Sequence, residues 1–127
     1  MILNEQEVKT CLEFALKPIL KKYFIDVRDI DLKIDKKILL SAHAIYQGND
    51  IHLACEFLLS YEEGKLGFIN IQGKLDYAFL QLSAFHILKQ MTQNTPLICK
   101  NNSCYYPCNL PIQSIEVLPQ SLKVQLK

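Results

Sequence analysis

The first 23 residues show the spacing of an amphipathic helix. Asn4 followed by Glu7 predicts an N-cap with a capping pair, in which Asn takes the place of the usual Ser or Thr. Apolar residues then recur three and four positions apart and form one stripe: Val8, Cys11, Leu12, Ala15, Leu16, Ile19, Leu20 and Tyr23. Pro18 removes the hydrogen bond to the Phe14 carbonyl, so we expect a kinked helix over about 5–23.

The next part of the chain alternates between apolar and polar residues, which predicts antiparallel strands. The alternating segments are 30–35, 38–46, 51–61 and 65–73. The dipeptide Gly48-Asn49 suits a two-residue hairpin turn, because glycine adopts the positive φ that such a turn needs. This register places Leu40 opposite Phe57 and puts the apolar residues of both strands on one face.

The following turn sets the register of the fourth strand. A three-residue loop, 62–64, places Phe57 opposite Ile69 and keeps the core face apolar, whereas a two-residue loop places Phe57 opposite Asn70. We therefore expect the three-residue loop. The outer face then carries an apolar group at one end: Leu39, Leu58, Leu66 and Phe68. Such a group indicates that this end is covered on both sides, or that it carries a partner or ligand.

A second amphipathic helix is predicted over about 77–92, with Asp76 as its N-cap. Its apolar side is broad: Leu80, Ala84, Ile87, Leu88 and Met91, with Tyr77 and Phe85 beside them. The remaining elements are a loop at 94–96, a hairpin over 97–106, and strands over 112–118 and 121–127. The order α-β-β-β-β-α-β-β(-β) predicts one α+β domain over 1–127, with an antiparallel meander sheet packed on two helices.

Composition narrows the class of protein. The chain has 127 residues, of which 50% are hydrophobic and 21% are charged, as in a folded domain. Its net charge of +1 gives no electrostatic footprint for nucleic acid. No apolar run reaches the roughly 18 residues of a transmembrane segment. The N-terminus, MILNEQEVKTC, does not resemble a signal peptide, so we expect a cytoplasmic protein by default, or an exported or membrane-anchored one if a signal has been removed.

Three of the five cysteines lie within CKNNSCYYPC, residues 99–108. Zinc sites usually bring cysteines in pairs and need four ligands, and a second pair is missing here. Cys11 and Cys55 fall on expected core faces, although His86 could serve as a fourth ligand. A metal site on Cys99, Cys104 and Cys108 is therefore one hypothesis.

Hairpin geometry gives a second interpretation of the same segment. If Asn101-Asn102 forms the turn, Cys99 lies directly opposite Cys104. A disulfide is feasible at that spacing and would close only a small loop. The third interpretation is that the cysteines are reduced thiols on a β-ribbon, where they pack as small apolar residues.

The predicted outer face also carries two histidines. The expected register places His43 opposite Ala54 and His52 opposite Ile45, so the histidines are diagonal neighbours about 7–8 Å apart. Glu56 shares this face, and two histidines with one glutamate can hold a metal or transfer protons. The alternative is the solvated face of an antiparallel sheet. The chain lacks hydrolase, zinc-protease, P-loop and dinucleotide fingerprints, so no catalytic residue or cofactor is assigned.

The second half of the chain resembles a known architecture. It reads GKLDYAFLQLSAFHILKQM, then the cysteine hairpin, then LPIQSIEVLPQSLKVQL. This pattern is similar to small bacterial domains of unknown function with the tubular lipid-binding (TULIP-like) architecture. The resemblance implies a long curled sheet wrapped on a helix, with an apolar groove for acyl chains. Family members are usually exported or membrane-anchored, whereas this chain shows neither a signal nor an anchor.

The first functional hypothesis is a non-enzymatic module that binds a lipid or another hydrophobic ligand between the second helix and the sheet. The expected lining residues are Leu80, Ala84, Phe85, Leu88 and Met91 on the helix and Leu58, Leu66 and Phe68 on the sheet. The second hypothesis is a homodimeric, protein-binding adaptor similar to a secretion chaperone, since excess apolar surface also serves an interface. The third is a thiol- or metal-dependent protein built on the cysteine cluster.

Overall fold

The structure is a computed structural model that describes residues 1–93 and 95–127, without the side chains of Ile19 and Met91. Its elements are, in order, β1 (Ile2–Asn4), α1 (Glu5–Lys22), β2 (Asp26–Ile34), β3 (Ile38–Tyr46), β4 (Asn49–Glu62), β5 (Lys65–Tyr77), β6 (Leu80–Ser83), α2 (Ala84–Met91), β7 (Ile98–Lys100), β8 (Ser103–Pro107), β9 (Ile112–Leu118) and β10 (Ser121–Leu126). Within the described ranges these elements form one α+β domain, as the alternation of patterns predicts.

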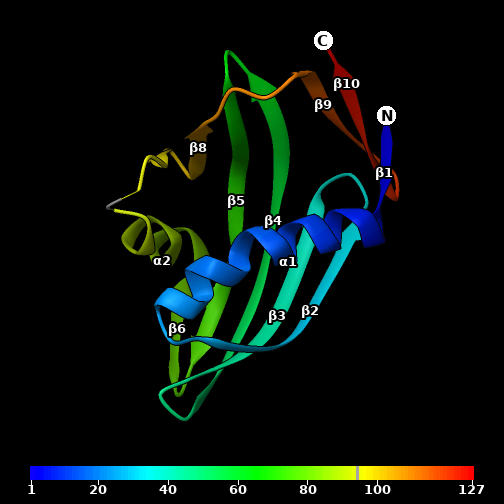
Figure 1. Cartoon of the computed structure of the whole chain (residues 1–127). Coiled ribbons are helices and arrows are strands. Elements are labelled where there is room, and N and C mark those ends of the chain that lie inside the picture. Colours follow the sequence, from blue (N-terminus) through cyan, green and yellow to red (C-terminus); the bar gives the residue numbers. More distant parts are fainter. Residues whose placement is uncertain (94) are drawn as a thin grey trace.

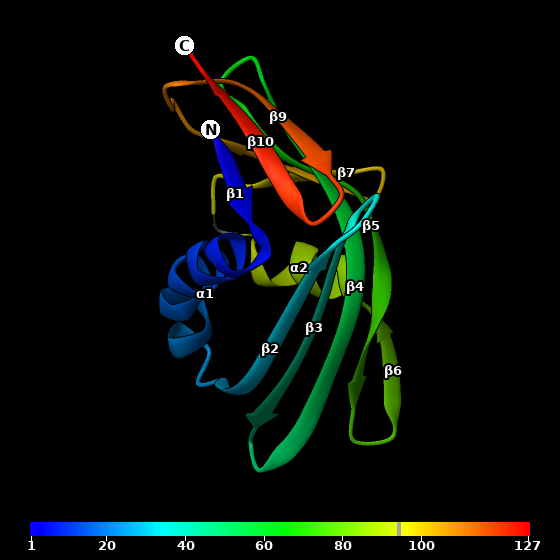
Figure 2. The same ribbon diagram turned by 90° about the vertical axis from the view of Figure 1, so that its right-hand side faces the viewer.

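Two antiparallel sheets organise the chain. The main sheet has the strand order β2-β3-β4-β5-β8-β7, with β6 paired to β5, and it stays open rather than closing into a barrel (Figure 1). The smaller sheet has the order β1-β10-β9. Both helices and the smaller sheet lie on the same face of the main sheet, which we call the inner face (Figure 2). The opposite face is the outer face.

The two ends of the main sheet differ. The smaller sheet and both chain termini lie at one end, which we call the upper end (Figure 1). At the lower end the β3–β4 turn, the β5–β6 turn and the connection from α1 to β2 lie beyond the cover of the smaller sheet (Figure 2). The core lies on the inner face nearer the upper end, and it draws on both helices and both sheets. Its buried members are Val8, Leu32, Ile34, Ile38, Leu40, Phe57, Ile71, Phe85, Cys104 and Leu122.

Helix α1 ends at Lys22, within one residue of the prediction. Its capping pair is also confirmed, because the Glu7 amide donates to Asn4 Oδ1 at 2.9 Å and the Asn4 amide donates to Glu7 Oε1 at 3.1 Å. Phe24, two residues after the end of the helix, is left-handed with a φ of 59°. Strand β1, which the pattern does not predict, precedes the helix and pairs with β10.

The β3–β4 turn lies one residue earlier than predicted. Gln47 and Gly48, with φ of 51° and 77°, form the two-residue turn and put glycine at its second position, as a type I′ turn prefers. Leu40 therefore pairs with Cys55 rather than with Phe57. The register changes by two residues, so each side chain keeps the face that the pattern gives it.

The β4–β5 turn is not the three-residue loop that we expect. Glu63 and Gly64 alone form it, with φ of 52° and 72°. The apolar pattern is restored further along by a β-bulge at Asn70, whose φ is 54°. This bulge shifts the register by one residue, so Phe57 and Ile71 both lie in the core.

The shorter turn changes which residues face outward. Because the strands next to the turn are displaced by one residue from the expected register, Phe68 pairs with Leu59 and Leu66 pairs with Tyr61, both on the inner face. Phe68 packs on the core, with its ring 5.9 Å from the ring of Phe57. The prediction that Phe68 and Leu66 face outward is therefore wrong. The apolar residues of the outer face here are Leu39, Leu58 and Ile69.

Helix α2 covers only the second half of the predicted 77–92. The first half forms the β5–β6 hairpin, whose turn begins at Ala78 with a φ of 54°. Ser83, and not Asp76, caps the helix, and its hydroxyl accepts a hydrogen bond from the His86 amide at 3.5 Å. Leu75, Tyr77, Leu80 and Leu82 alternate with polar residues or a turn, so the segment satisfies a strand pair as well as a helix.

Candidate functional site

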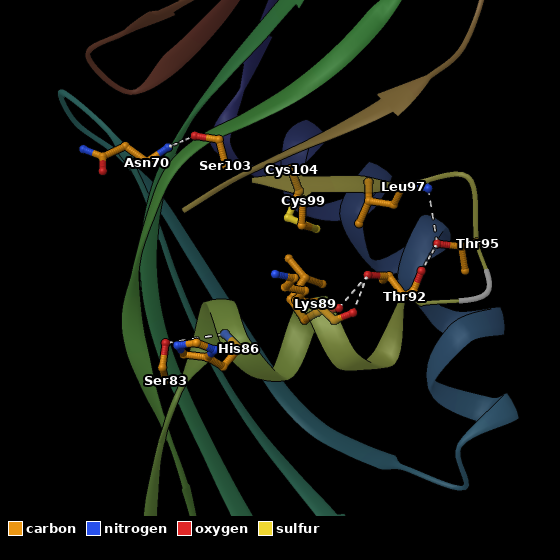
Figure 3. Close-up of a disulfide and its surroundings, with 11 residues drawn as sticks. Asn70, Ser83, His86, Lys89, Thr92, Thr95, Leu97, Cys99, Ser103 and Cys104 are labelled. Atoms are coloured by element: carbon orange, nitrogen blue, oxygen red, sulfur yellow. Dashed lines mark hydrogen bonds between the residues drawn. A yellow bond between two sulfur atoms is a disulfide. The ribbon is translucent and has the colours of Figure 1, made fainter. Parts of the chain in front are cut away.

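The cysteine hairpin has the predicted register. Asn101 and Asn102, with φ of 54° and 61°, form its turn. Cys99 pairs directly with Cys104 at a Cα–Cα distance of 4.0 Å, and the two are joined in a disulfide (Figure 3). Cys104 is fully buried in the core. The disulfide therefore belongs to the packed interior of the protein.

This hairpin is also fastened to the β-bulge of β5. The Ser103 hydroxyl accepts a hydrogen bond from the Asn70 amide at 2.9 Å (Figure 3), and the Asn102 carbonyl accepts one from the Ile71 amide at 2.6 Å. The bulge exposes backbone groups that no strand partner satisfies, and the hairpin supplies the missing hydrogen bonds. These hydrogen bonds indicate that the cysteine hairpin has a structural role.

The other cysteines do not complete a metal site. Cys11 is exposed on α1, so the prediction that it faces the core is wrong. Cys55 is half-buried on β4, and desolvation raises the pKa of its thiol to about 11. Across the described ranges, no group of three or more His, Cys, Asp or Glu residues is arranged to hold a metal ion. The disulfide leaves Cys108 as the member of the 99–108 cluster that is a free thiol.

The two histidines lie closer together than expected. His43 pairs directly with His52, and their rings stack with centroids 4.6 Å apart and planes 4° apart. The expected diagonal arrangement is wrong because the β3–β4 turn lies one residue earlier. Glu56 does not join them, since it pairs with Lys37 at 3.3 Å.

Carboxylates surround the histidine pair on the outer face. Asp50 Oδ1 lies 2.8 Å from His43 Nε2, and this hydrogen bond holds the pKa of Asp50 below its ordinary value. Asp29 Oδ2 lies 3.9 Å from His43 Nδ1, and Asp76 pairs with His52 in the strand register. The row is an exposed polar surface with paired charges, as a solvated sheet face would be.

The predicted ligand-lining residues are dispersed. Ala84 and Phe85 are buried, and Leu88 and Phe68 pack against the core. Leu80 lies on β6 with 49% of its surface exposed. Leu58 faces outward, Leu66 faces inward beside Tyr61, and the side chain of Met91 lies outside the described part of the chain.

The inner face remains partly open at its lower end. Four apolar side chains from neighbouring strands are only half-buried there: Ile51, Leu53, Leu75 and Leu82. Leu53 and Ile51 pair with Ala42 and Ala44 on β3, whose small side chains fill little space. The total accessible surface is 8566 Å², about a quarter more than the roughly 6,900 Å² expected for a compact protein of 14.6 kDa. Sequence alternation places these residues on one face, but it does not show that their burial is incomplete.

The outer face has a shallow depression, with a volume of about 430 Å³. Its walls mix apolar and charged side chains from β2 to β5: Asp31, Lys33, Leu39, Leu40, Ser41, Ala54, Cys55, Glu56, Gln72 and Gly73. Lys33 and Glu56 carry opposite charges and neither is buried. Such a depression has no converging set of donors or acceptors that would select a particular ligand.

No family model, curated protein or solved structure matches the chain significantly. The function is therefore inferred from the geometry of the structure. In the described ranges, no helix has both the length and the apolar character needed to cross a membrane.

Proposed function

We propose that this domain binds an extended hydrophobic ligand, such as an acyl chain, along the lower part of its inner face and does not catalyse a reaction. The observation that supports the proposal is the incomplete burial of four apolar side chains on this part of the inner face: Ile51, Leu53, Leu75 and Leu82. Burying a methylene group contributes about 0.8 kcal/mol, so these residues would gain stability from covering by a hydrocarbon chain.

The charge distribution supports an uncharged ligand chain. The inward-facing residues of β3 to β6 at the lower end include no charged side chain among those described: Ala42, Ala44, Tyr46, Ile51, Leu53, Cys55, Gly73, Leu75, Tyr77, Leu80 and Leu82. The charged residues of the same strands, such as Asp50 and Lys74, face outward. A charged ligand would lose its hydration on this inner face without gaining a partner.

Two residues at the opening can serve a polar group. The rings of Tyr46 and Tyr77 lie 5.9 Å apart at the lower end of β3 and β5. A tyrosine presents an apolar ring and a hydroxyl that donates or accepts a hydrogen bond. An amphipathic ligand would therefore place its chain on the leucines and its polar head near these hydroxyls. Leu80, one of the residues expected from the sequence, pairs with Tyr77 from β6.

Native mass spectrometry of the purified protein, before and after addition of a long-chain fatty acid or a lysophospholipid, tests the proposal. Leu53 and Leu58 offer a matched pair, since both are half-buried leucines of β4 and they face opposite sides. Leu53→Asn should reduce ligand occupancy by tenfold or more, whereas Leu58→Asn should leave it unchanged. A protein that gains no mass with either ligand, or equal losses in the two variants, would overturn the proposal.

A second function, a protein-binding homodimer, is favoured by the upper part of the outer face. Leu39 and Ile98 are 40% and 56% exposed there, and Leu58 and Ile69 lie between them. Contiguous exposed apolar residues of this kind are typical of interfaces. Light scattering at micromolar concentration distinguishes the two functions, because a dimer that Leu39→Glu dissociates supports the second one. A monomer that is unaffected by this substitution contradicts it.

A further inference from the structure

We propose that the lower end of the molecule docks on the surface of a lipid bilayer, with the side chains of Phe24 and Phe79 inserted at the interface. Both side chains are almost fully exposed, at 88% and 95%. Single exposed apolar residues are ordinary on protein surfaces. These two differ in that they occupy the tips of separate turns at the same end of the fold.

The backbone holds each phenylalanine outward. Phe24 lies between α1 and β2 with a φ of 59°, and Ala78, which precedes Phe79 in the β5–β6 turn, has a φ of 54°. Positive φ is unfavourable for residues other than glycine, and it is least expected for a bulky side chain such as phenylalanine. This conformation terminates α1, since the Phe24 amide donates to the Lys21 carbonyl at 3.1 Å and the Ile25 amide donates to the Leu20 carbonyl at 2.9 Å. Backbone hydrogen bonds therefore hold the turn, and the side chain of Phe24 projects into solvent.

Figure 2 shows the two turns in the lower part of the molecule, on either side of the β3–β4 turn. This is also where the inner face is open and where Tyr46 and Tyr77 lie. Docking at this end would place the opening of the proposed ligand site against the membrane. The bilayer would then be the source or the destination of the hydrocarbon chain, and in this respect the inference rests on the proposed function.

The shape of this end favours a bilayer over a protein partner. A stable protein interface buries about 800 Å² on each side as a continuous, closely packed patch. Two phenylalanines on separate turns, next to polar residues such as Gln47 and Asn49, do not form such a patch. A bilayer interface accepts apolar side chains that protrude singly, and aromatic rings partition well into its headgroup region.

The nearby charges are of both signs. Lys21 and Lys22 end α1 just before Phe24, while Asp26 and Asp50 lie close by on β2 and β4. Arg28 is already paired with Asp26 at 3.0 Å. Since the cations are largely balanced, insertion of the phenylalanine rings should dominate the binding. We therefore expect docking to neutral phosphatidylcholine vesicles, with only a modest increase when phosphatidylserine is included.

Co-sedimentation with phosphatidylcholine vesicles tests the inference. Phe24→Asn and Phe79→Ser should each lower the partition coefficient roughly tenfold, because burial of a phenylalanine side chain is lost. Asn tolerates positive φ, so the first variant keeps the turn. Phe14→Ser is the control, since Phe14 is 83% exposed but lies in the middle of α1. A wild-type protein that does not sediment with the vesicles, or a Phe14→Ser variant as impaired as Phe79→Ser, would refute docking.

A test of vesicle docking and a test of the proposed ligand site give separate results. Leu53→Asn should bind vesicles like the wild type, although it should not retain a fatty acid in native mass spectrometry. Loss of vesicle binding in Phe79→Ser with full retention of fatty acid supports docking as a distinct step. Retention of fatty acid by a wild-type protein that ignores vesicles overturns docking alone.

Discussion

His43 and His52 face each other across β3 and β4 with their rings stacked 4.6 Å apart. The pair lies on the outer face, away from the open inner face that we propose as the ligand site. Asp50, two residues before His52 on the same strand, forms a hydrogen bond with His43 at 2.8 Å. The sheet register thus brings two basic rings and one carboxylate into contact, and the charge of the carboxylate should depend on its neighbours.

The first prediction concerns the titration of Asp50. The hydrogen bond from His43, followed by the charges of His43 and His52, lowers the pKa of Asp50 from its ordinary 3.8. The interaction therefore adds stability above pH 3.8, and this stability is lost as the pH falls through the lower pKa of the folded state. His43→Ala should raise the Asp50 pKa toward 3.8 in a carboxyl NMR titration. The same substitution at His86, on α2, should leave it unchanged, and identical titration curves for His43→Ala and the wild type would contradict the prediction.

The second prediction concerns thiol reactivity. Cys11 is exposed, whereas Cys55 is half-buried and has a pKa raised from 9.0 to about 11 by desolvation. Because the thiolate is the reactive form, an aromatic disulfide reagent at pH 8 should label Cys11 quickly and Cys55 only after unfolding. Burial of the neutral thiol also adds stability that is present below pH 9 and lost between about pH 9 and pH 11. Peptide mapping after timed labelling measures the labelling rate of each cysteine. Equal labelling rates at Cys11 and Cys55 would contradict the burial of Cys55.

The third prediction concerns the disulfide. Cys99 and Cys104 are separated by five positions, and a loop this short contributes about 2 kcal/mol in the chain-entropy model. Cys99→Ser should lower the free energy of unfolding by about that amount in urea denaturation. Cys104→Ser should cost about 1–3 kcal/mol more, since it places a hydroxyl at a fully buried position. Cys108→Ser is the control, because Cys108 is a free thiol. If reductant did not change the free energy of unfolding of the wild-type protein, the disulfide would contribute nothing to stability.

Much of the fold follows from the sequence because local rules agree with the tertiary structure. The first helix, the four long strands, the cysteine hairpin and the final strand pair are all confirmed, with their ends displaced by up to four residues. In each of them the hydrophobic period and a capping or turn signal point to the same element. The turn at Gln47-Gly48 shows how robust the pattern is, since a register error of two residues leaves every side chain on its predicted face.

The failures arise where two arrangements satisfy the same pattern. Turn chemistry and face alternation conflict at Glu63-Gly64, and the chain resolves the conflict with a bulge at Asn70, six residues after the end of the expected loop. The bulge is stable because the cysteine hairpin, more than thirty residues further along, satisfies its backbone. Local patterns do not contain such a long-range contact. For the same reason, the sequence places Phe68 on the wrong face and extends α2 across a strand pair.

The fourth prediction uses two glycines in different surroundings. Gly73 pairs with Cys55 on the inner face, and a Cβ atom at Gly73 would overlap the Ala54 carbonyl oxygen and lie 2.6 Å from the Cβ of Cys55. The first of these groups belongs to the β4 backbone, so it cannot withdraw without disturbing the β4–β5 pairing. Gly73→Ala should therefore lower the free energy of unfolding by about 3 kcal/mol.

Gly48→Ala provides the matched control, because Gly48 has a φ of 77° but no atom within 4 Å of an added Cβ. This variant should lose only the roughly 1–2 kcal/mol of a left-handed alanine. Gly73 also has a positive φ, 150°, so both variants carry backbone strain, and the additional loss of stability in Gly73→Ala in urea denaturation measures the steric overlap. If Gly73→Ala proved as stable as Gly48→Ala, the close approach of β4 and β5 at this point would be wrong.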